Sequence, residues 1–298
     1  MRNIAPMAID PETPSEALVC ALLAAQFPHW ADLPVTRVAS GAANALFRLG
    51  DELTVRVPLR ASAARDAEKE YRFLPRLGPH LPLPIPVPLA LGSPSDAYPL
   101  SWSVVPWLTG TDAAASPGLD RLRLARDVAG FLRALQAIPT LEGPPPRTGA
   151  GRGGPLRAND ALVERCLGTL AGVIDTGAAA RCWADALEAS VYSGPPVWLH
   201  GDLHPANLLV ADGRLSAVID WGSLSVGDPA TEMMFAWLGL DPSSRALLRE
   251  LLAIDDATWQ RGRGWALLLL VEALARDGDA NPAVAGFLRG VVSDVVAG

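Results

Sequence analysis

The sequence predicts an α+β protein of two lobes, a small antiparallel β-sheet lobe followed by a mostly helical lobe. Three observations support this fold class. Short β-type segments separated by turn residues dominate the first third of the chain, helix-period apolar patterns dominate the rest, and one loop-and-hairpin region interrupts the helices. We place the boundary after Pro106, which gives lobes of residues 1–106 and 107–298.

The first lobe is expected to begin with strands joined by tight turns. Val35–Val38 leads into a turn of small residues, Ser40–Asn44. Ala45–Leu49 and Leu53–Val57 then flank Gly50-Asp51 and predict a β-hairpin, because a short Gly-Asp connection between alternating apolar segments is a hairpin signal.

A charged helix is predicted over Ala61–Leu77, ending near Gly78. The proline-studded segment 81–88 comes next. Proline fixes φ and lacks a backbone donor, so this segment predicts an extended connection. Ser101–Val105 is predicted as a strand, with Pro106–Gly110 as the linker that follows it.

The second lobe opens with a helix-period stripe of apolar residues over Leu119–Ile138. Residues 143–155 are rich in Gly and Pro and predict a surface loop. Further helices are expected at Asp160–Leu170, at Ala178–Tyr192 and from Pro229 to the end, with the loop-and-hairpin region at Val197–Ile219.

Composition excludes several classes of protein. The 298 residues carry a net charge of −7, which disfavours nucleic-acid binding because phosphate contacts need clustered basic groups. No apolar run in the sequence approaches the ~20 residues of a membrane-spanning helix; Trp265–Val271, for example, stops at Glu272. No secretory signal is visible, and Cys20, Cys166 and Cys182 suggest neither a disulfide framework nor a metal knuckle. We therefore expect a cytoplasmic monomer without nucleic-acid or membrane partners.

One octapeptide carries the strongest chemical signal. It reads His200-Gly201-Asp202-Leu203-His204-Pro205-Ala206-Asn207, and a short hairpin turning at 211–213 follows it and ends at Asp220-Trp221-Gly222. The hairpin is expected to bring Asp220 back beside Asn207, so that Asp202, Asn207 and Asp220 converge.

These three side chains suit phosphoryl transfer to a hydroxyl group. One carboxylate orients the hydroxyl and accepts its proton, while an amide oxygen and a second carboxylate are hard ligands for Mg²⁺. The spacing H-x-D-x-x-x-x-N followed by D-x-G is the one that kinases use. A lone Asp before a hairpin is usually a turn or capping residue, but the full set of spaced matches is hard to produce by chance.

With these motifs, HGDLHPANLLV, AVIDWG and GDPATE, the chain resembles the aminoglycoside phosphotransferase family. That family shares the protein-kinase-like fold with macrolide phosphotransferases and choline kinases. The resemblance runs from about Val35 to about Leu270 and implies a sheet lobe of five strands and one helix, with the nucleotide between the lobes and the acceptor on the helical lobe.

The resemblance also implies roles for individual residues. Asp202 would be the catalytic carboxylate, and Asn207 and Asp220 would hold Mg²⁺. Arg56 falls where kinases place the Lys that pairs with the phosphates, and a guanidinium can grip phosphate too; Glu70 would be its ion-pair partner. The remaining nucleotide-binding residues would be Ser40, Gly41 and Asn44 over the phosphates, and Val105 and Trp107 at the hinge that touches the base.

Two neighbours of these residues are given structural roles. Lys69 stands one position before Glu70, so both cannot face the same way, and we expect Lys69 to be exposed. Asp228 is expected to cap the helix that follows it.

The implied function is a Mg²⁺-dependent kinase that uses ATP, with GTP as the alternative, and an aminoglycoside-type antibiotic as acceptor. A macrolide, a cyclic peptide antibiotic and a choline- or homoserine-like metabolite remain alternative acceptors, and a non-catalytic pseudokinase module is the alternative from another class. Glu232 and Glu272 are candidate substrate residues. Other candidates for a cationic, sugar-like acceptor are the acidic residues Asp241, Asp255, Asp256, Asp277 and Asp279 and the tryptophans Trp237, Trp259 and Trp265.

Overall fold

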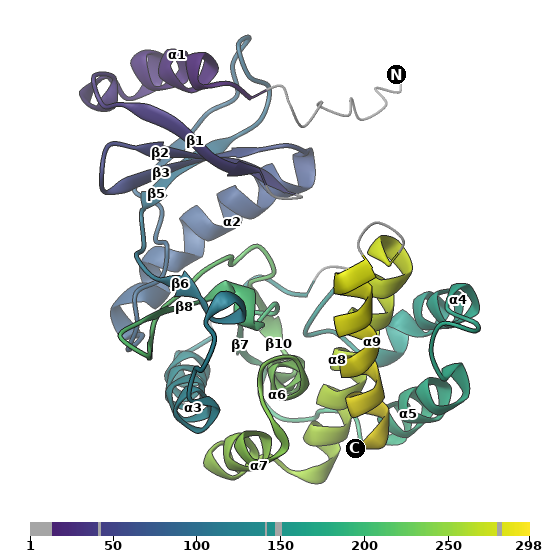
Figure 1. Ribbon diagram of the computed structural model, residues 1–298. Helices are drawn as coiled ribbons and strands as arrows, with labels where there is room; N and C mark the ends of the chain where they lie inside the picture. Colours follow the sequence, from purple (N-terminus) through teal and green to yellow (C-terminus); the bar gives the residue numbers. More distant parts are fainter. Residues whose placement is uncertain (1–13, 41–42, 141, 147–150, 279–281) are drawn as a thin grey trace. The chain divides into compact units, whose positions relative to one another are not determined.

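The computed structural model describes residues 14–298 except 41–42, 141, 147–150 and 279–281 (Figure 1). Two compact units make up the chain. The first runs to Gly110 and includes the later segment Ala217–Gly222. The second holds Thr111–Ser216 and Ser223–Gly298.

The first unit is built on a five-stranded antiparallel sheet in the order β1-β2-β3-β5-β4. The predicted hairpin is confirmed, since Leu49 pairs with Leu53 and Gly50 turns the chain with a φ of 57°. The strands are β1 (Val35–Ser40), β2 (Asn44–Leu49), β3 (Leu53–Pro58), β4 (Ala90–Gly92) and β5 (Trp102–Pro106).

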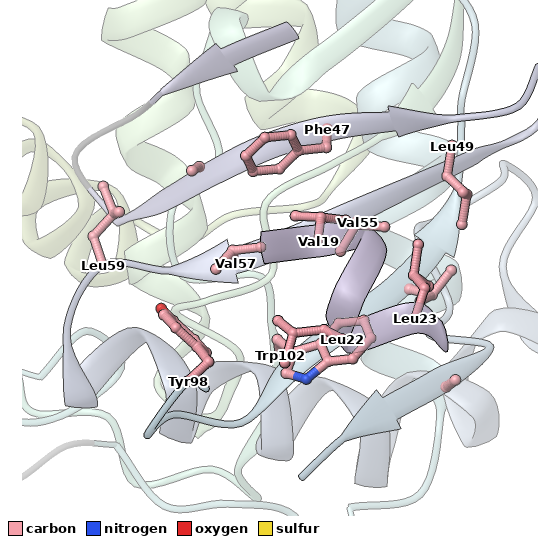
Figure 2. Close-up of a cluster of buried hydrophobic side chains, with 13 residues drawn as sticks. Val19, Leu22, Leu23, Phe47, Leu49, Val55, Val57, Leu59, Tyr98 and Trp102 are labelled. Atoms are coloured by element: carbon pink, nitrogen blue, oxygen red, sulfur yellow. The ribbon is translucent and has the colours of Figure 1, made fainter. Parts of the chain in front are cut away.

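A helix that the sequence analysis did not predict, α1 (Glu16–Gln26), covers one face of this sheet (Figures 1 and 2). Ser15 caps it by accepting a hydrogen bond from the N–H of Leu18 at 3.2 Å. Apolar side chains of α1 and the sheet form one buried cluster; Figure 2 shows Val19, Leu22, Leu23, Phe47, Leu49, Val55, Val57, Leu59, Tyr98 and Trp102.

Helix α2 (Ala61–Leu77) has the predicted bounds and lies across the other face of the sheet (Figure 1). Its buried positions include Ala63, Ala67, Glu70, Leu74 and Leu77, a spacing of four and three that places them on one side of the helix. The proline segment after α2 forms neither helix nor strand, as predicted.

The second unit is mostly helical, as predicted. Helix α8 (Asp256–Asp277) packs against α4, α5, α9 and the 3₁₀ helix η6. The other helices are α3 (Arg121–Ala137), α4 (Asp160–Thr169), α5 (Thr176–Glu188), α6 (Phe235–Gly239), α7 (Pro242–Leu251), α9 (Pro282–Ala297) and η6 (Pro229–Met234). Among the residues that the structure describes, no helix has the length and apolarity needed to cross a membrane.

Short strands frame the loop-and-hairpin region of the second unit. β7 (Val197–Leu199) pairs with β10 (Ser225–Gly227), and β8 (Leu208–Ala211) lies between β6 (Thr111–Asp112) and β9 (Arg214–Val218). Asp212 and Gly213 both have positive φ, 51° and 70°, which suits the two-residue turn between β8 and β9. The remaining 3₁₀ helices are η1 (Pro28–Trp30), η2 (Gly78–His80), η3 (Ala113–Ala115), η4 (Leu156–Asn159) and η5 (Pro205–Asn207).

The Gly- and Pro-rich segment 143–155 differs from the surface loop that the sequence predicts. Gly151 and Gly153 are buried, and Gly153 runs close to β10, where its carbonyl accepts a hydrogen bond from the N–H of Asp228 at 3.1 Å. A Cβ on Gly227 would lie 2.2 Å from that carbonyl oxygen. Glycine is therefore required here for close backbone packing.

Several acidic residues of the helical unit that are candidates for contact with an acceptor have structural roles. Asp241 and Asp255 are the N-caps of α7 and α8, accepting hydrogen bonds from the N–H groups of Ser244 and Thr258. Hydrogen bonds from Ser243 and Ser244 lower the pKa of Asp241 to about 2. Asp256 pairs with Arg249. Asp279 lies outside the described residues.

Candidate active site

The predicted catalytic loop connects β7 to β8 and presents Asp202 with about a quarter of its side chain exposed. Gly201, which precedes it, has a φ of 78°, and a Cβ there would lie 2.6 Å from the carbonyl oxygen of Ser223. Only glycine fits this conformation and this spacing. The N–H of Asp202 donates to Nδ1 of the buried His200 at 3.2 Å, which fixes the backbone beneath the carboxylate.

Asn207 folds back onto the same loop. Its amide nitrogen donates to the carbonyl oxygen of Asp202 at 2.9 Å and lies 3.1 Å from Nε2 of His204. Both contacts use Nδ2, and no donor among the described residues reaches Oδ1. The structure thus brings Asp202 and Asn207 together and leaves an amide oxygen free to accept.

Glu232, which we expected among the substrate residues, is fully buried beneath the catalytic loop. Its Oε1 accepts the N–H of Gly201 at 3.0 Å, while Oε2 has no partner among the described residues. Burial raises the pKa of Glu232 to about 7, and the nearby Asp202 adds to this, while the N–H groups of Gly201 and His200 act in the opposite direction. This geometry suits a residue that positions the loop rather than one that touches an acceptor.

Glu232 is expected to make the free energy of unfolding depend on pH. Its pKa is about 7 in the folded protein and 4.5 ordinarily, so the folded chain retains a proton that the unfolded chain releases. The part of the stability that this group contributes is fully present below about pH 4.5, and about 3 kcal/mol of it is lost as pH rises to about 7. Urea unfolding of wild type and Glu232→Gln across this range measures the effect, and the variant should lack this component.

Glu250→Gln is a matched control, because Glu250 is exposed on α7. It should keep the wild-type pH dependence. Identical pH profiles for wild type and Glu232→Gln would show that Glu232 does not titrate in this range.

The first unit contains the predicted pair of Arg56 on β3 and Glu70 on α2. The guanidinium contacts both carboxylate oxygens, one through Nη1 and the other through Nη2 at 3.3 Å, and the Glu70 side chain is fully buried. Burial alone lowers the pKa of Arg56, but the carboxylates of Glu70, Asp220 and Asp66 outweigh it and raise the pKa above its ordinary value. Arg56 thus stands among several carboxylates.

Asp220 follows β9 and belongs to the first unit. It is exposed and has a φ of 61°, an uncommon backbone conformation for a residue with a side chain. Such strain is found at functional sites, where the surrounding structure holds it in place. Because Asp202 and Asn207 lie in the second unit, their convergence with Asp220 stays a prediction.

The expectation that Lys69 is exposed is wrong. Only 17% of its side chain is accessible, its ammonium group donates to the carbonyl oxygen of Gly222 at 2.7 Å, and Asp66 lies 3.4 Å away. Consecutive helix positions point about 100° apart, so α2 can direct Glu70 to the sheet and Lys69 to the segment that carries Asp220. Sequence reasoning missed this contact, although Lys69 is the only lysine in the chain.

The other predicted nucleotide-binding residues lie in β1, β2 and β5. Ser40 ends β1, Asn44 begins β2, and Gly41 lies outside the described residues. Val105 is buried in β5, and the N–H of Trp107 already donates to the carbonyl oxygen of Glu52 at 2.7 Å. The guanidinium of Arg48 lies 3.9 Å from the Trp107 ring. Their contact with a nucleotide stays a prediction.

A cavity of about 220 Å³ lies entirely within the second unit. Glu272 on α8 lines it together with Trp265, Leu268, Asn159, Ser223 and Arg152. Glu272 makes no ion pair among the described residues, so its carboxylate is available to a ligand. Arg152 also pairs with Asp202, which connects this cavity to the catalytic loop.

Arg152 is a second residue that the sequence analysis missed. It stands among glycines in a segment that reads as an ordinary loop, and no spacing rule connects it with Asp202 fifty positions later.

The predicted tryptophans lie mainly in the core. Trp237 and Trp265 are buried, and the ring of Trp237 lies 4.7 Å from that of Trp259. Asp228 caps η6 as predicted, accepting the N–H of Ala230 at 2.9 Å, and it also pairs with the buried Arg261.

The donor atoms present are suitable for Mg²⁺. In the described part of the chain no group of three or more His, Cys, Asp or Glu side chains forms a metal cluster. Mg²⁺ is commonly held by one or two protein oxygens together with substrate phosphates. Oδ1 of Asn207 in the second unit and the exposed carboxylate of Asp220 in the first unit are each an oxygen donor of this kind.

Comparison with known proteins gives one family match. The model of the family described as "Phosphotransferase enzyme family" matches residues 34–265, which is most of the chain. No curated protein sequence matches.

Several solved structures share the fold. The GDP and kanamycin complex of APH(2″)-IIia has a TM-score of 0.74 at 18% identity and covers 94% of this chain and 98% of its own. The macrolide 2′-phosphotransferase of Brachybacterium faecium, an apoenzyme, has a TM-score of 0.62 at 19% identity, with coverages of 93% and 97%. The streptomycin–ATP complex of APH(2″)-IIa has a TM-score of 0.60 at 17% identity, with coverages of 88% and 90%. The predicted protein-kinase-like fold, with an antiparallel sheet lobe and a mostly helical lobe, is confirmed.

Proposed function

The chain belongs to the phosphotransferase enzyme family, and we propose that it is a Mg²⁺-dependent kinase that transfers the γ-phosphoryl group of ATP to a hydroxyl group of a small molecule. The catalytic loop is the observation that carries this proposal. Asp202, Asn207 and the buried Glu232 are joined by hydrogen bonds through the loop backbone, which fixes the backbone that carries the Asp202 carboxylate.

In this proposal Asp202 orients the acceptor hydroxyl and takes its proton. The acceptor oxygen forms a bond to the γ-phosphorus as the bond to the β-phosphate oxygen breaks, and the nucleoside diphosphate leaves. Phosphoryl transfer needs little covalent chemistry from the protein. The main task of the protein is therefore to hold the acceptor oxygen, the γ-phosphorus and the leaving oxygen in line.

The first unit would hold the nucleotide, with Arg56 gripping phosphate oxygens through a guanidinium already oriented by Glu70. Asn207 and Asp220 would hold Mg²⁺, which supplies charge neutralisation at the phosphates when bound. ATP is proposed over GTP because it is the commoner donor for kinases of this kind. The solved relatives include complexes with both GDP and ATP.

The acceptor is proposed to be a cationic antibiotic of the aminoglycoside type. Glu272 supports this, since a carboxylate without an ion-pair partner lines the cavity that Arg152 connects to Asp202. A carboxylate that is buried or half-buried is poorly hydrated, so a cationic ligand stabilises it more than it would stabilise an exposed carboxylate. Solved relatives include complexes with kanamycin and streptomycin.

A screen for ADP release tests the proposal. Wild-type protein, ATP and Mg²⁺ are incubated with aminoglycosides, macrolides, peptide antibiotics and amino alcohols. We expect turnover with an aminoglycoside and none above blank when EDTA removes Mg²⁺. Turnover confined to a neutral acceptor would contradict the cationic-acceptor proposal and leave the kinase proposal intact. GTP replaces ATP in a parallel series.

Glu272→Gln sharpens the test. Loss of the charge should raise KM for the aminoglycoside about tenfold, as for one lost charged hydrogen bond, and leave KM for ATP unchanged. Glu164→Gln, an exposed change on α4, should alter neither value. Equal effects of Glu272→Gln on both substrates would show that the carboxylate only supports the helix.

A further inference from the structure

The guanidinium of Arg152 is placed on the carboxylate that we propose as catalytic. Its Nη1 contacts Oδ1 of Asp202 and also donates to the carbonyl oxygen of Gly201 at 3.0 Å. Both side chains of the pair are 26% exposed, so the contact is partly shielded from water. Oδ2 of Asp202 has a weaker neighbour, Nε2 of His204 at 3.9 Å. The two carboxylate oxygens therefore stand in different surroundings.

The backbone of Arg152 is held in place from both sides. Its carbonyl oxygen accepts a hydrogen bond from Oγ of Ser225 at 3.2 Å, and the next carbonyl, that of Gly153, accepts the N–H of Asp228 at 3.1 Å. Gly153 has a φ of 88°, and a Cβ there would lie 2.5 Å from a methyl group of Leu199. The glycines around Arg152 thus let its backbone pack directly against β7, the strand that leads into the catalytic loop, and against β10, the strand paired with β7.

From this geometry we propose that Arg152 is a positioning residue of the phosphoryl transfer, which holds Oδ1 of Asp202 so that Oδ2 accepts the hydroxyl proton. The inference rests on the function proposed above. A carboxylate free to rotate would present either oxygen to the acceptor, whereas one anchored at Oδ1 presents Oδ2 in a fixed plane. The hydrogen bond from Arg152 to the carbonyl oxygen of Gly201 fixes this plane relative to the loop backbone.

The bond changes remain those of the proposed reaction. The O–H bond of the acceptor breaks, its proton goes to Oδ2, the acceptor oxygen bonds to phosphorus, and the nucleoside diphosphate departs. Arg152 keeps its own protons throughout, since a guanidinium is not deprotonated in proteins. Its contribution is orientation, so its loss should lower kcat more than it raises either KM.

Arg152→Ala, Arg152→Lys and the control Arg157→Ala test this role. Arg157 is exposed on η4, close in sequence, and among the described residues it donates to the carbonyl oxygen of Leu187 at 3.4 Å. Each full-length variant is assayed with ATP and Mg²⁺ and with two acceptor probes, kanamycin and water. Melting temperature is measured in parallel to verify folding.

We expect Arg152→Ala to lower kcat about 10- to 100-fold, with KM for ATP unchanged; this is the range found when a residue that orients a metal ligand by hydrogen bonding is removed. Arg152→Lys should recover part of the rate, and millimolar guanidinium ion should raise the rate of Arg152→Ala and leave that of Arg157→Ala unchanged. In the Asp202→Asn background, Arg152→Ala should not lower kcat further, because both residues act on the same step.

Two outcomes would overturn the inference. One is an Arg152→Ala rate equal to that of Arg157→Ala, and the other is a rise in KM for ATP at constant kcat, which would make Arg152 a phosphate ligand. Failure of the wild-type protein with both probes and with the wider acceptor screen would instead reject the proposed function itself.

Discussion

Replacing Asp202 with asparagine is expected to lower kcat by about 10²- to 10⁴-fold, the usual contribution of a general base. The amide keeps the size of the carboxylate but cannot accept the hydroxyl proton. Nucleotide binding should persist, because the change leaves Arg56 and Glu70 in the first unit untouched. ADP release measures kcat, and the shift of melting temperature with ATP and Mg²⁺ measures binding.

Asp212→Asn is a matched control for this variant. Asp212 is exposed in the turn between β8 and β9, where its φ of 51° is one that asparagine adopts readily. This control should keep the wild-type rate. An Asp202→Asn protein as active as the Asp212→Asn control would remove Asp202 from the mechanism.

Glu70→Ala is expected to reduce the free energy of unfolding by about 3 kcal/mol, the lower end for breaking a buried ion pair. The Glu70 side chain is fully buried and that of Arg56 is 12% exposed, so truncation leaves a guanidinium poorly hydrated. Asp220 and Asp66 remain as weaker neighbours of Arg56 and limit the loss. Urea unfolding measures the change.

The double change Arg56→Met with Glu70→Leu should be less destabilising than Glu70→Ala alone, because an apolar pair of similar volume leaves no buried charge. Arg65→Ala, an exposed position on α2, should change the unfolding free energy by less than about 0.5 kcal/mol. A Glu70→Ala loss no larger than that of Arg65→Ala would mean that the pair contributes little to stability.

The sequence predicted those parts of the fold whose signal is local. The bounds of α2 followed from its charge pattern and from Gly78, and the β2–β3 hairpin from its short turn. The catalytic loop was recognised because the spacing from His200 to Asn207 lies within one short segment. Such features need no knowledge of tertiary contacts.

Contacts between distant segments could not be predicted in this way. Arg152 meets Asp202 across fifty positions, and Lys69 meets Gly222 across 153. Neither contact leaves a periodic pattern in the sequence. The pairing of Arg56 with Glu70 was expected only from the family resemblance, because no spacing rule joins a strand residue to a helix residue fourteen positions later.

Two short elements also escaped prediction for physical reasons. Strand β4 has only three residues and follows prolines, so no alternation marks it. Helix α1 is apolar on much of its surface, so its sequence does not distinguish a buried helix from a buried strand.

The central claim is transfer of a phosphoryl group to a small-molecule hydroxyl through Asp202. The most direct measurement uses γ-labelled ATP in a single turnover and counts the label on the acceptor, for wild type, wild type with EDTA, and Asp202→Asn. We predict labelled acceptor in the first reaction and almost none in the other two. Equal labelling by wild type and Asp202→Asn, or label found on no acceptor of the screen, would contradict the claim.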